Sequence, residues 1–167
     1  YVFKTGSNIR MTWLIKDNDG NQSTMSSYNS SNGWIPDDTW AHIVATRDGS
    51  ANQQNIYINA VQAQVTKTDT TSGDFTAYDK ISLGNDNYSG GRYWFVGNQD
   101  EVAIFDYALS GANVTSLYNS GEPTNLADFG TPPVLWYRMG DKVTSFPTIP
   151  DQIGSTNGTA TNMVVGD

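Results

Sequence analysis

The sequence contains no cysteine, only one histidine (His42) and only two glutamates (Glu101 and Glu122). Without cysteine the chain can form neither a disulfide nor a thiolate metal site. A single histidine cannot complete a histidine-based zinc site either. No apolar run approaches the roughly 20 residues that span a bilayer, and no signal-peptide pattern is present. We therefore expect no disulfide scaffold, no zinc centre of these kinds and no membrane insertion.

Charged residues make up only 16% of the chain, against about a quarter in an average protein. Acidic residues outnumber basic ones, which gives a net charge of −8 and a pI near 4.3. Such a surface repels phosphate groups, so we expect no nucleic-acid partner. Asn, Ser, Thr, Gly and Tyr replace the missing charges and suit turns and half-exposed strands. Five Trp and nine Tyr bury large areas when packed, which favours a folded domain.

Alternating apolar residues predict a first strand at residues 9–16. The dipeptide Asp19-Gly20 follows and is a strong signal for a hairpin turn in which both central residues have positive φ. The surrounding acidic stretch, residues 17–21, also has the composition of a calcium loop. Its Gly is misplaced for an EF-hand and no bidentate Glu follows, so the pattern favours the turn.

The next hairpin is predicted over residues 54–65 and turns at Asn59-Ala60. Gly would be ideal at the second position. Either this turn is not type I′, or Ala60 carries the strain of a positive φ. Residues 30–37 read as a polar loop. Further strands are predicted at 40–49, 80–85, 93–96, 100–105 and 134–141.

The apolar period changes after Leu109. Ser110 is a suitable N-cap, and Val114, Leu117 and Tyr118 have helical spacing. Gly121 and the proline that follows it end the helix. One short helix near residues 110–120 among many short strands predicts an all-β fold, an antiparallel β-sandwich or jelly roll.

Three passages share an order and spacing with one family. They are D-T-W-A-H-I-V-A-T-R-D-G with N-I-Y-I-N-A-V (residues 38–61), I-S-L-G-N with W-F-V-G (81–97), and D-E-V-A-I-F-D-Y-A-L-S (100–110). Together they resemble the laminin-G-like jelly-roll modules of the concanavalin A-like lectin/glucanase superfamily. Ala60, where the family usually has Gly, is the clearest departure. The resemblance implies a module at residues 1–121, lacking its first strands, and a linker at 122–133.

The C-terminal passages V-L-W-Y-R-M-G-D and D-Q-I-G-S-T-N-G-T-A-T-N-M resemble the opening strands of the same module type. Similar tails follow such modules in structural proteins of tailed bacterial viruses. Two layouts fit residues 134–167. They either begin a second module, or they add strands to the first sandwich, within one chain or between neighbours. Because an unpaired sheet edge promotes aggregation, the second layout is favoured.

In such modules the Asp-Glu pair begins a core strand, which implies that Asp100 points inward and accepts backbone hydrogen bonds. The enzymes of the superfamily instead carry a Glu-x-Asp-x-x-Glu strand. Neither Glu101 nor Glu122 fits that pattern. His42 lies in a predicted strand without a nucleophile-elbow motif, and we expect it to be buried and hydrogen-bonded. The sequence therefore predicts a non-catalytic protein.

A lectin-type site joins an aromatic face, against which a sugar ring stacks, to polar groups that bind its hydroxyls. This composition occurs in the candidate carbohydrate-binding residues Asp86, Asn87, Tyr88, Tyr93 and Trp94. It occurs again in Trp34, near Asp37 and Asp38. The alternative is that Trp94 and Trp34 pack in the core or its rim.

Calcium is common in the wider family, and the resemblance suggests Asp86, Asn87 and Asp100 as its candidate ligands. The predicted function is a non-catalytic glycan-binding or adhesion module on the exterior of a virion or cell. The alternative is a structural or assembly domain of a virion or extracellular filament that binds no sugar. The expected partners are glycans or neighbouring subunits of the same assembly, including a homo-oligomer.

Overall fold

The computed structural model describes residues 2–5, 8–27, 34–36, 38–72, 82–86, 93–95, 97–140, 143 and 145–161. Of several strand residues, including Trp34, Asp86, Tyr93 and Trp94, only the backbone is described. The chain forms two compact units. The first unit comprises Tyr1–Val96 and Leu109–Glu122, and the second comprises Gly97–Ala108 and Pro123–Asp167. Each unit therefore combines two separate segments of the chain. The predicted division at residues 121 and 133 stays a prediction.

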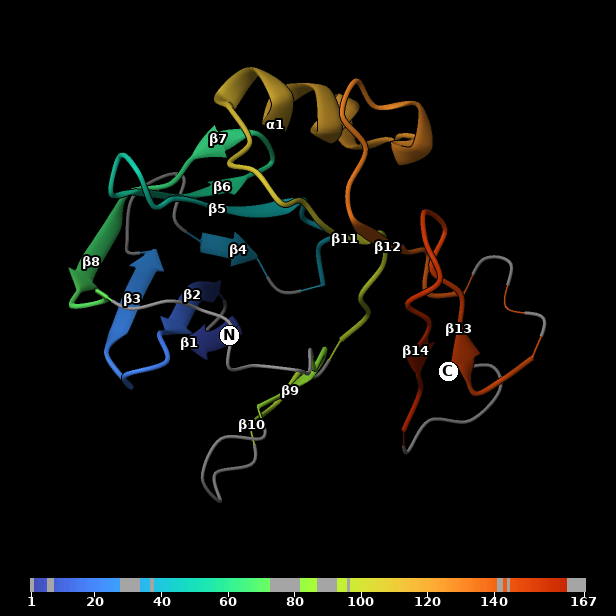
Figure 1. The fold of residues 1–167 in the computed structure, drawn as a ribbon, viewed down its shortest axis with the longest axis horizontal. Coiled ribbons are helices and arrows are strands. Elements are labelled where there is room, and N and C mark those ends of the chain that lie inside the picture. The colour runs from blue at the N-terminus through green and yellow to red at the C-terminus, as the bar shows by residue number, and fades with distance from the viewer. Residues whose placement is uncertain are drawn as a thin grey trace. The chain divides into compact units, whose positions relative to one another are not determined.

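The first unit contains a five-stranded antiparallel sheet in the order β1-β2-β3-β8, with β4 also paired to β2 (Figure 1). Its strands are β1 (Val2–Thr5), β2 (Asn8–Lys16), β3 (Gln22–Ser27), β4 (Trp34–Pro36) and β8 (Val65–Asp69). Strand β2 confirms the prediction for residues 9–16. Strand β4 corrects the predicted loop at 30–37: Ile35 pairs with Ile9 and is only 4% exposed, so its burial favours an extended backbone.

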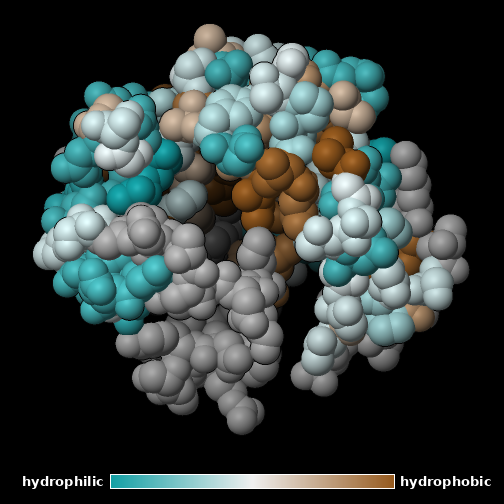
Figure 2. Space-filling model, viewed as in Figure 1, coloured by the Kyte–Doolittle hydropathy of each residue, from teal (hydrophilic) through white to brown (hydrophobic). Residues whose placement is uncertain are grey.

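A second antiparallel sheet of this unit contains β5 (Ile43–Asp48), β6 (Gln53–Ile58) and β7 (Val61–Gln62). Helix α1 (Gly111–Tyr118) lies over one face of this sheet, and the five-stranded sheet lies on the other side (Figure 1). Buried side chains from both sheets form one core, made by Met25, Ile35, Ile56, Ile58 and Ala63. Figure 2 shows that the surface over β3 and β8 is mostly hydrophilic. In a β-sandwich each sheet turns an apolar face toward the core and a polar face toward solvent.

The predicted hairpin turn at Asp19-Gly20 is present, but its geometry differs from the prediction. Only Gly20 has a positive φ, of 85°. Asp17, which is 1% exposed, accepts hydrogen bonds from the backbone N–H groups of Asp19 and Asn21 at 3.1 and 2.8 Å. Its other oxygen accepts one from Ser72 N–H at 2.9 Å. The first carboxylate of the acidic stretch thus organises the turn and fixes it to a later segment.

Two alternatives were predicted for the Asn59-Ala60 turn, and the structure has the one in which Ala60 is strained. Both residues have positive φ, 50° and 64°, and Ile58 pairs directly with Val61, which is the geometry of a type I′ turn. The side-chain oxygen of Asn59 accepts a hydrogen bond from His42 N–H at 2.9 Å. This bond anchors the turn to the start of the neighbouring strand, although Ala60 lacks the freedom of glycine.

Helix α1 confirms the predicted helix and its cap. The Ser110 side chain accepts from Asn113 N–H at 3.2 Å, while Asn113 Oδ1 accepts from Ser110 N–H at 3.1 Å. This reciprocal pair is a capping box. Val114 and Leu117 are buried. The helix ends at Asn119, which has a left-handed backbone, and a 3-10 turn (η1, Asn119–Gly121) follows.

The second unit contains two short antiparallel ribbons and a 3-10 turn. Strand β11 (Val102–Ile104) pairs with β12 (Leu135–Tyr137), and β13 (Thr148–Ile149) pairs with β14 (Gly158–Thr159). The turn is η2 (Leu126–Asp128). All three residues of β12 are buried. Strand β13 was missed because residues 145–150 carry no alternation.

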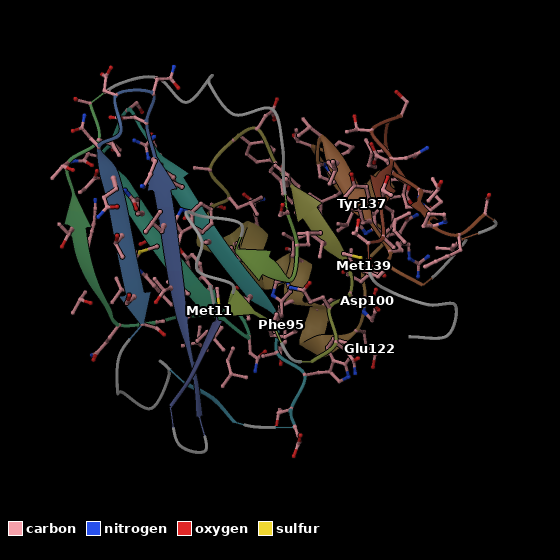
Figure 3. The ribbon with its side chains drawn as sticks, turned by 90° about the horizontal axis from the view of Figure 1, so that it is seen from below. Met11, Phe95, Asp100, Glu122, Tyr137 and Met139 are labelled. Carbon is pink, nitrogen blue, oxygen red and sulfur yellow. The ribbon has the colours of Figure 1, made fainter. Side chains whose placement is uncertain are left out.

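Asp151 holds the C-terminal motif D-x-x-G-x-x-N-G-T together. One carboxylate oxygen accepts from Trp136 N–H and Ile153 N–H, each at 3.1 Å, and the other from Thr156 N–H at 3.3 Å. The ring of Tyr137 points toward the same segment (Figure 3), and its hydroxyl donates to the carbonyl of Thr156 at 2.6 Å. Burial raises the pKa of Asp151, but backbone N–H groups outweigh burial and lower its pKa below the ordinary value.

Most of the regular secondary structure among the described residues is antiparallel strand, and these residues include one α-helix. This confirms the predicted fold class. Among them, no helix is long and apolar enough to cross a membrane.

Candidate functional site

The predicted sugar site falls on a two-stranded ribbon of the first unit. Strand β9 (Asn85–Asp86) pairs with β10 (Tyr93–Trp94) in a register that opposes Asp86 to Tyr93 and Asn85 to Trp94. A bond of 2.9 Å from Phe95 N–H to the carbonyl of Gly84 extends the ladder. Tyr93 and Trp94 therefore each have a polar residue directly across the ladder. Asn87 and Tyr88 lie outside the described residues.

The second predicted aromatic, Trp34, lies on β4, where its backbone pairs with Arg10. Asp37 lies outside the described residues. Asp38 is exposed and has a positive φ of 56°. The structure describes no contact that joins Trp34 to Asp38, so this candidate stays a prediction.

Sequence reasoning missed the exposure of Trp40. It was predicted to begin a strand, but β5 starts at Ile43 and the Trp40 side chain is 67% exposed. An exposed indole is unusual because burial of a side chain of this size is strongly favourable. The alternation of residues 40–46 suggested a strand and gave no sign of exposure. Trp40 is therefore a further candidate contact for a protein partner.

His42 occupies a half-buried place beside helix α1. Its ring stacks on that of Tyr118 with centroids 5.8 Å apart. Desolvation lowers the pKa of His42 below its ordinary value. The prediction of a hydrogen-bonded ring is wrong for Nδ1, which is buried without a partner among the described residues.

The side chains of Asp100 and Glu101 have other positions and partners than predicted. Asp100 is exposed, and its Oδ1 accepts from the adjacent Glu101 N–H at 2.8 Å. Glu101 is the half-buried member, and its two oxygens accept from Trp136 Nε1 at 2.7 Å and Arg138 Nε at 3.0 Å. The prediction that Asp100 points inward is therefore wrong. Strand β11 begins only at Val102, because Glu101 has a left-handed backbone with φ of 51°.

A recess in the second unit lies beside this cluster. Its volume is about 340 Å³, and its lining consists of Pro123, Thr124, Asn125, Trp136 and Arg138. The Arg138 guanidinium lies 5.6 Å from the centroid of the Trp136 ring, within reach of a cation–π interaction. Glu101, the residue before β11, thus fixes two of the five lining side chains. No sequence signal joined these residues, because Glu101 and Trp136 are 35 positions apart.

A comparison with known protein families shows to which superfamily the chain belongs. A laminin-G-type family model, described as the concanavalin A-like lectin/glucanases superfamily, matches residues 1–115. The chain belongs to this superfamily. No curated protein and no solved structure matches the chain significantly. No comparison supports the resemblance to virion proteins.

Members of the laminin-G-like branch commonly bind carbohydrate or mediate adhesion, and their fold is generally non-catalytic. The matched residues include both candidate aromatic sites and the Asp-Glu pair, and end before residues 134–167. The match thus supports a family-type module over residues 1–115, but fold alone does not determine the ligand.

Among the described side chains, no cluster of three or more His, Asp or Glu is arranged to hold a metal. Of the predicted calcium ligands, Asn87 lies outside the described residues and only the backbone of Asp86 is described. Asp100 is exposed on the second unit. Calcium at these three residues therefore stays a prediction.

Proposed function

We propose that the chain is a non-catalytic glycan-binding or adhesion module displayed on the exterior of a virion or cell. The single observation that carries this proposal is the β9–β10 register, which opposes Asp86 to Tyr93 and Asn85 to Trp94. A sugar needs an apolar ring face to stack on and polar groups to bind its hydroxyls. The ribbon supplies both residue types side by side.

The state of Glu101 supports a non-catalytic role. A retaining glycosidase needs a second carboxyl group about 5–5.5 Å from the first, one as nucleophile and one as acid. Both oxygens of Glu101 already accept hydrogen bonds from Trp136 and Arg138. The other glutamate, Glu122, follows the helix in the first unit and is exposed. Glu101 is thus used as a structural side chain, and Glu122 belongs to the other unit.

A glycan-array screen tests the proposal. We expect the intact chain to bind a defined subset of glycans and Trp94→Ala to lose that binding at least about tenfold, because aromatic stacking contributes strongly to sugar affinity. Trp34→Ala tests the second predicted aromatic. Trp40→Ala is the matched control, since it removes another tryptophan, one that is 67% exposed. An intact chain that binds no glycan would refute the proposal.

A second candidate function is a structural or assembly domain without a sugar ligand. The exposed Trp40 indole favours it, because large aromatic side chains are enriched at protein interfaces. We expect light scattering to show a homo-oligomer that Trp40→Ala dissociates. A persistent monomer would count against this candidate.

A further inference from the structure

The recess in the second unit has the size of a small-molecule site. Its volume of about 340 Å³ lies at the lower end of the roughly 300–1,000 Å³ that is usual for such sites. Pro123, Thr124 and Asn125 line it from one segment, and Trp136 and Arg138 from another. A hydroxyl, an amide and a guanidinium thus line the recess together with the ring of Pro123 and the ring of Trp136, which is 4% exposed.

These side chains are held in place before any ligand arrives. The Glu101 carboxylate fixes both the indole of Trp136 and the guanidinium of Arg138. Asn125 Nδ2 donates to Asp128 Oδ2 at 2.6 Å. Fixed polar groups lower the entropic cost of binding.

Backbone strain lies next to the recess. Glu101 has φ of 51° and Met139, beside Arg138, has φ of 35°. Left-handed backbones at non-glycine residues are costly and gather at functional sites. Here the strain lies at the residue that pairs with the guanidinium and at the residue that follows Arg138.

The charges indicate a neutral ligand. Arg138 is paired with Glu101 at 3.0 Å, so its charge is balanced. The chain carries a net charge of −8, which repels anions. Hydroxyl groups can both donate to and accept from amides, hydroxyls and ion pairs. A ring with several hydroxyls and one apolar C–H face would match the lining.

We propose that this recess binds one neutral hexopyranose unit, as a second saccharide site separate from the β9–β10 ribbon. The proposal depends on the proposed function only for the class of ligand, a saccharide. It places the second site outside the residues 1–115 that match the family. Two sites on one chain would let it hold a branched or repeated glycan at two points, which increases avidity without new contacts.

Nitrogen–proton NMR correlation spectra of the whole chain test the recess directly. The probes are the methyl glycosides of glucose, galactose and mannose. We expect at least one of them to shift the Trp136 indole N–H and the Asn125 side-chain amide signals. Thr124→Val removes the hydroxyl at nearly constant volume, and Arg138→Lys keeps the charge but loses the planar fork. Each should weaken binding roughly two- to tenfold, the effect of one hydrogen bond.

The matched control is Thr131→Val, an exposed threonine of the same unit outside the recess lining, and it should bind as the intact chain does. Trp94→Ala separates the two proposals, because loss of array binding with unchanged shifts at Trp136 leaves the recess as an independent site. Absence of shifts at Trp136 and Asn125 with all three glycosides would overturn the inference. Undiminished affinity in both Thr124→Val and Arg138→Lys would overturn it as well.

Discussion

The carboxylate of Glu101 accepts a hydrogen bond of 2.7 Å from the indole nitrogen of Trp136, which lies on the adjacent strand. Trp136 is 4% exposed, so its N–H would otherwise be buried without a partner. The same carboxylate binds Arg138. Glu101 therefore joins β11 to β12 through side chains as well as through the backbone ladder, and its role is structural.

We expect Glu101→Gln to lower the free energy of unfolding by about 1–2 kcal/mol, because it removes a partly exposed charge-assisted bond to Arg138. Urea denaturation measures this change. Glu122→Gln is the matched control, because it alters the other, exposed glutamate, and it should change stability by less than about 0.5 kcal/mol. Equal stability of Glu101→Gln and the parent would show that the bonds of Glu101 to Trp136 and Arg138 do not stabilise the fold.

Ala60→Gly should stabilise the protein by about 1 kcal/mol. Ala60 has φ of 64° in a type I′ turn, and glycine adopts that backbone without the steric cost that a Cβ brings. Thermal unfolding measures the gain. Ala51→Gly, in a turn where the residue has no positive φ, provides the comparison and should not stabilise. A lower melting temperature for Ala60→Gly would contradict the assigned strain.

Stability should fall in acid through Asp151. Its pKa is lowered in the folded chain from the ordinary value of 3.8. Its contribution is therefore complete above pH 3.8 and is lost as the pH falls through the lower folded value. Urea denaturation at a series of acidic pH values measures this loss.

Asp151→Asn should remove part of that acid dependence and lower stability at neutral pH by about 2–4 kcal/mol, because a buried carboxylate that accepts several backbone bonds is replaced. Asp106→Asn changes an exposed aspartate of the same unit and should leave both the stability and its acid dependence nearly unchanged. If the two variants behave alike, Asp151 does not organise the C-terminal motif.

His42 should contribute a second pH dependence, at higher pH. Desolvation lowers its pKa from 6.5 in the folded chain. The unfolded chain then takes up a proton first, so stability is complete above pH 6.5 and falls as the pH drops toward the folded pKa. His42→Phe keeps a ring beside Tyr118 and removes the titrating group. Its melting temperature should vary less than that of the parent between about pH 5 and 7; an unchanged slope would assign this dependence to another group.

Local signals in the sequence predicted local structure well. The helix after Ser110 follows from its cap, its apolar spacing and its stop signals, all within a few residues. The Asn59-Ala60 turn was located correctly because two apolar strands flank it. The strain at Ala60 was one of two stated alternatives, and only the backbone angles distinguish them.

Long-range contacts could not be predicted in the same way. Asp100 and Glu101 are adjacent acidic residues at the start of a strand, and alternation alone does not say which one is half-buried. That choice depends on Trp136 and Arg138, which are far along the chain. Trp40 is a similar case, because its exposure depends on where β5 begins.

The most direct test of the proposed function is titration calorimetry with the strongest glycan from the array, using the intact chain, Trp94→Ala and Trp40→Ala. We predict saturable binding by the intact chain, a loss of at least about tenfold in Trp94→Ala and unchanged affinity in Trp40→Ala. The glycan should be recovered uncleaved after prolonged incubation. Equal affinity of Trp94→Ala and the intact chain, or cleavage of the glycan, would contradict a non-catalytic glycan-binding site on the β9–β10 ribbon.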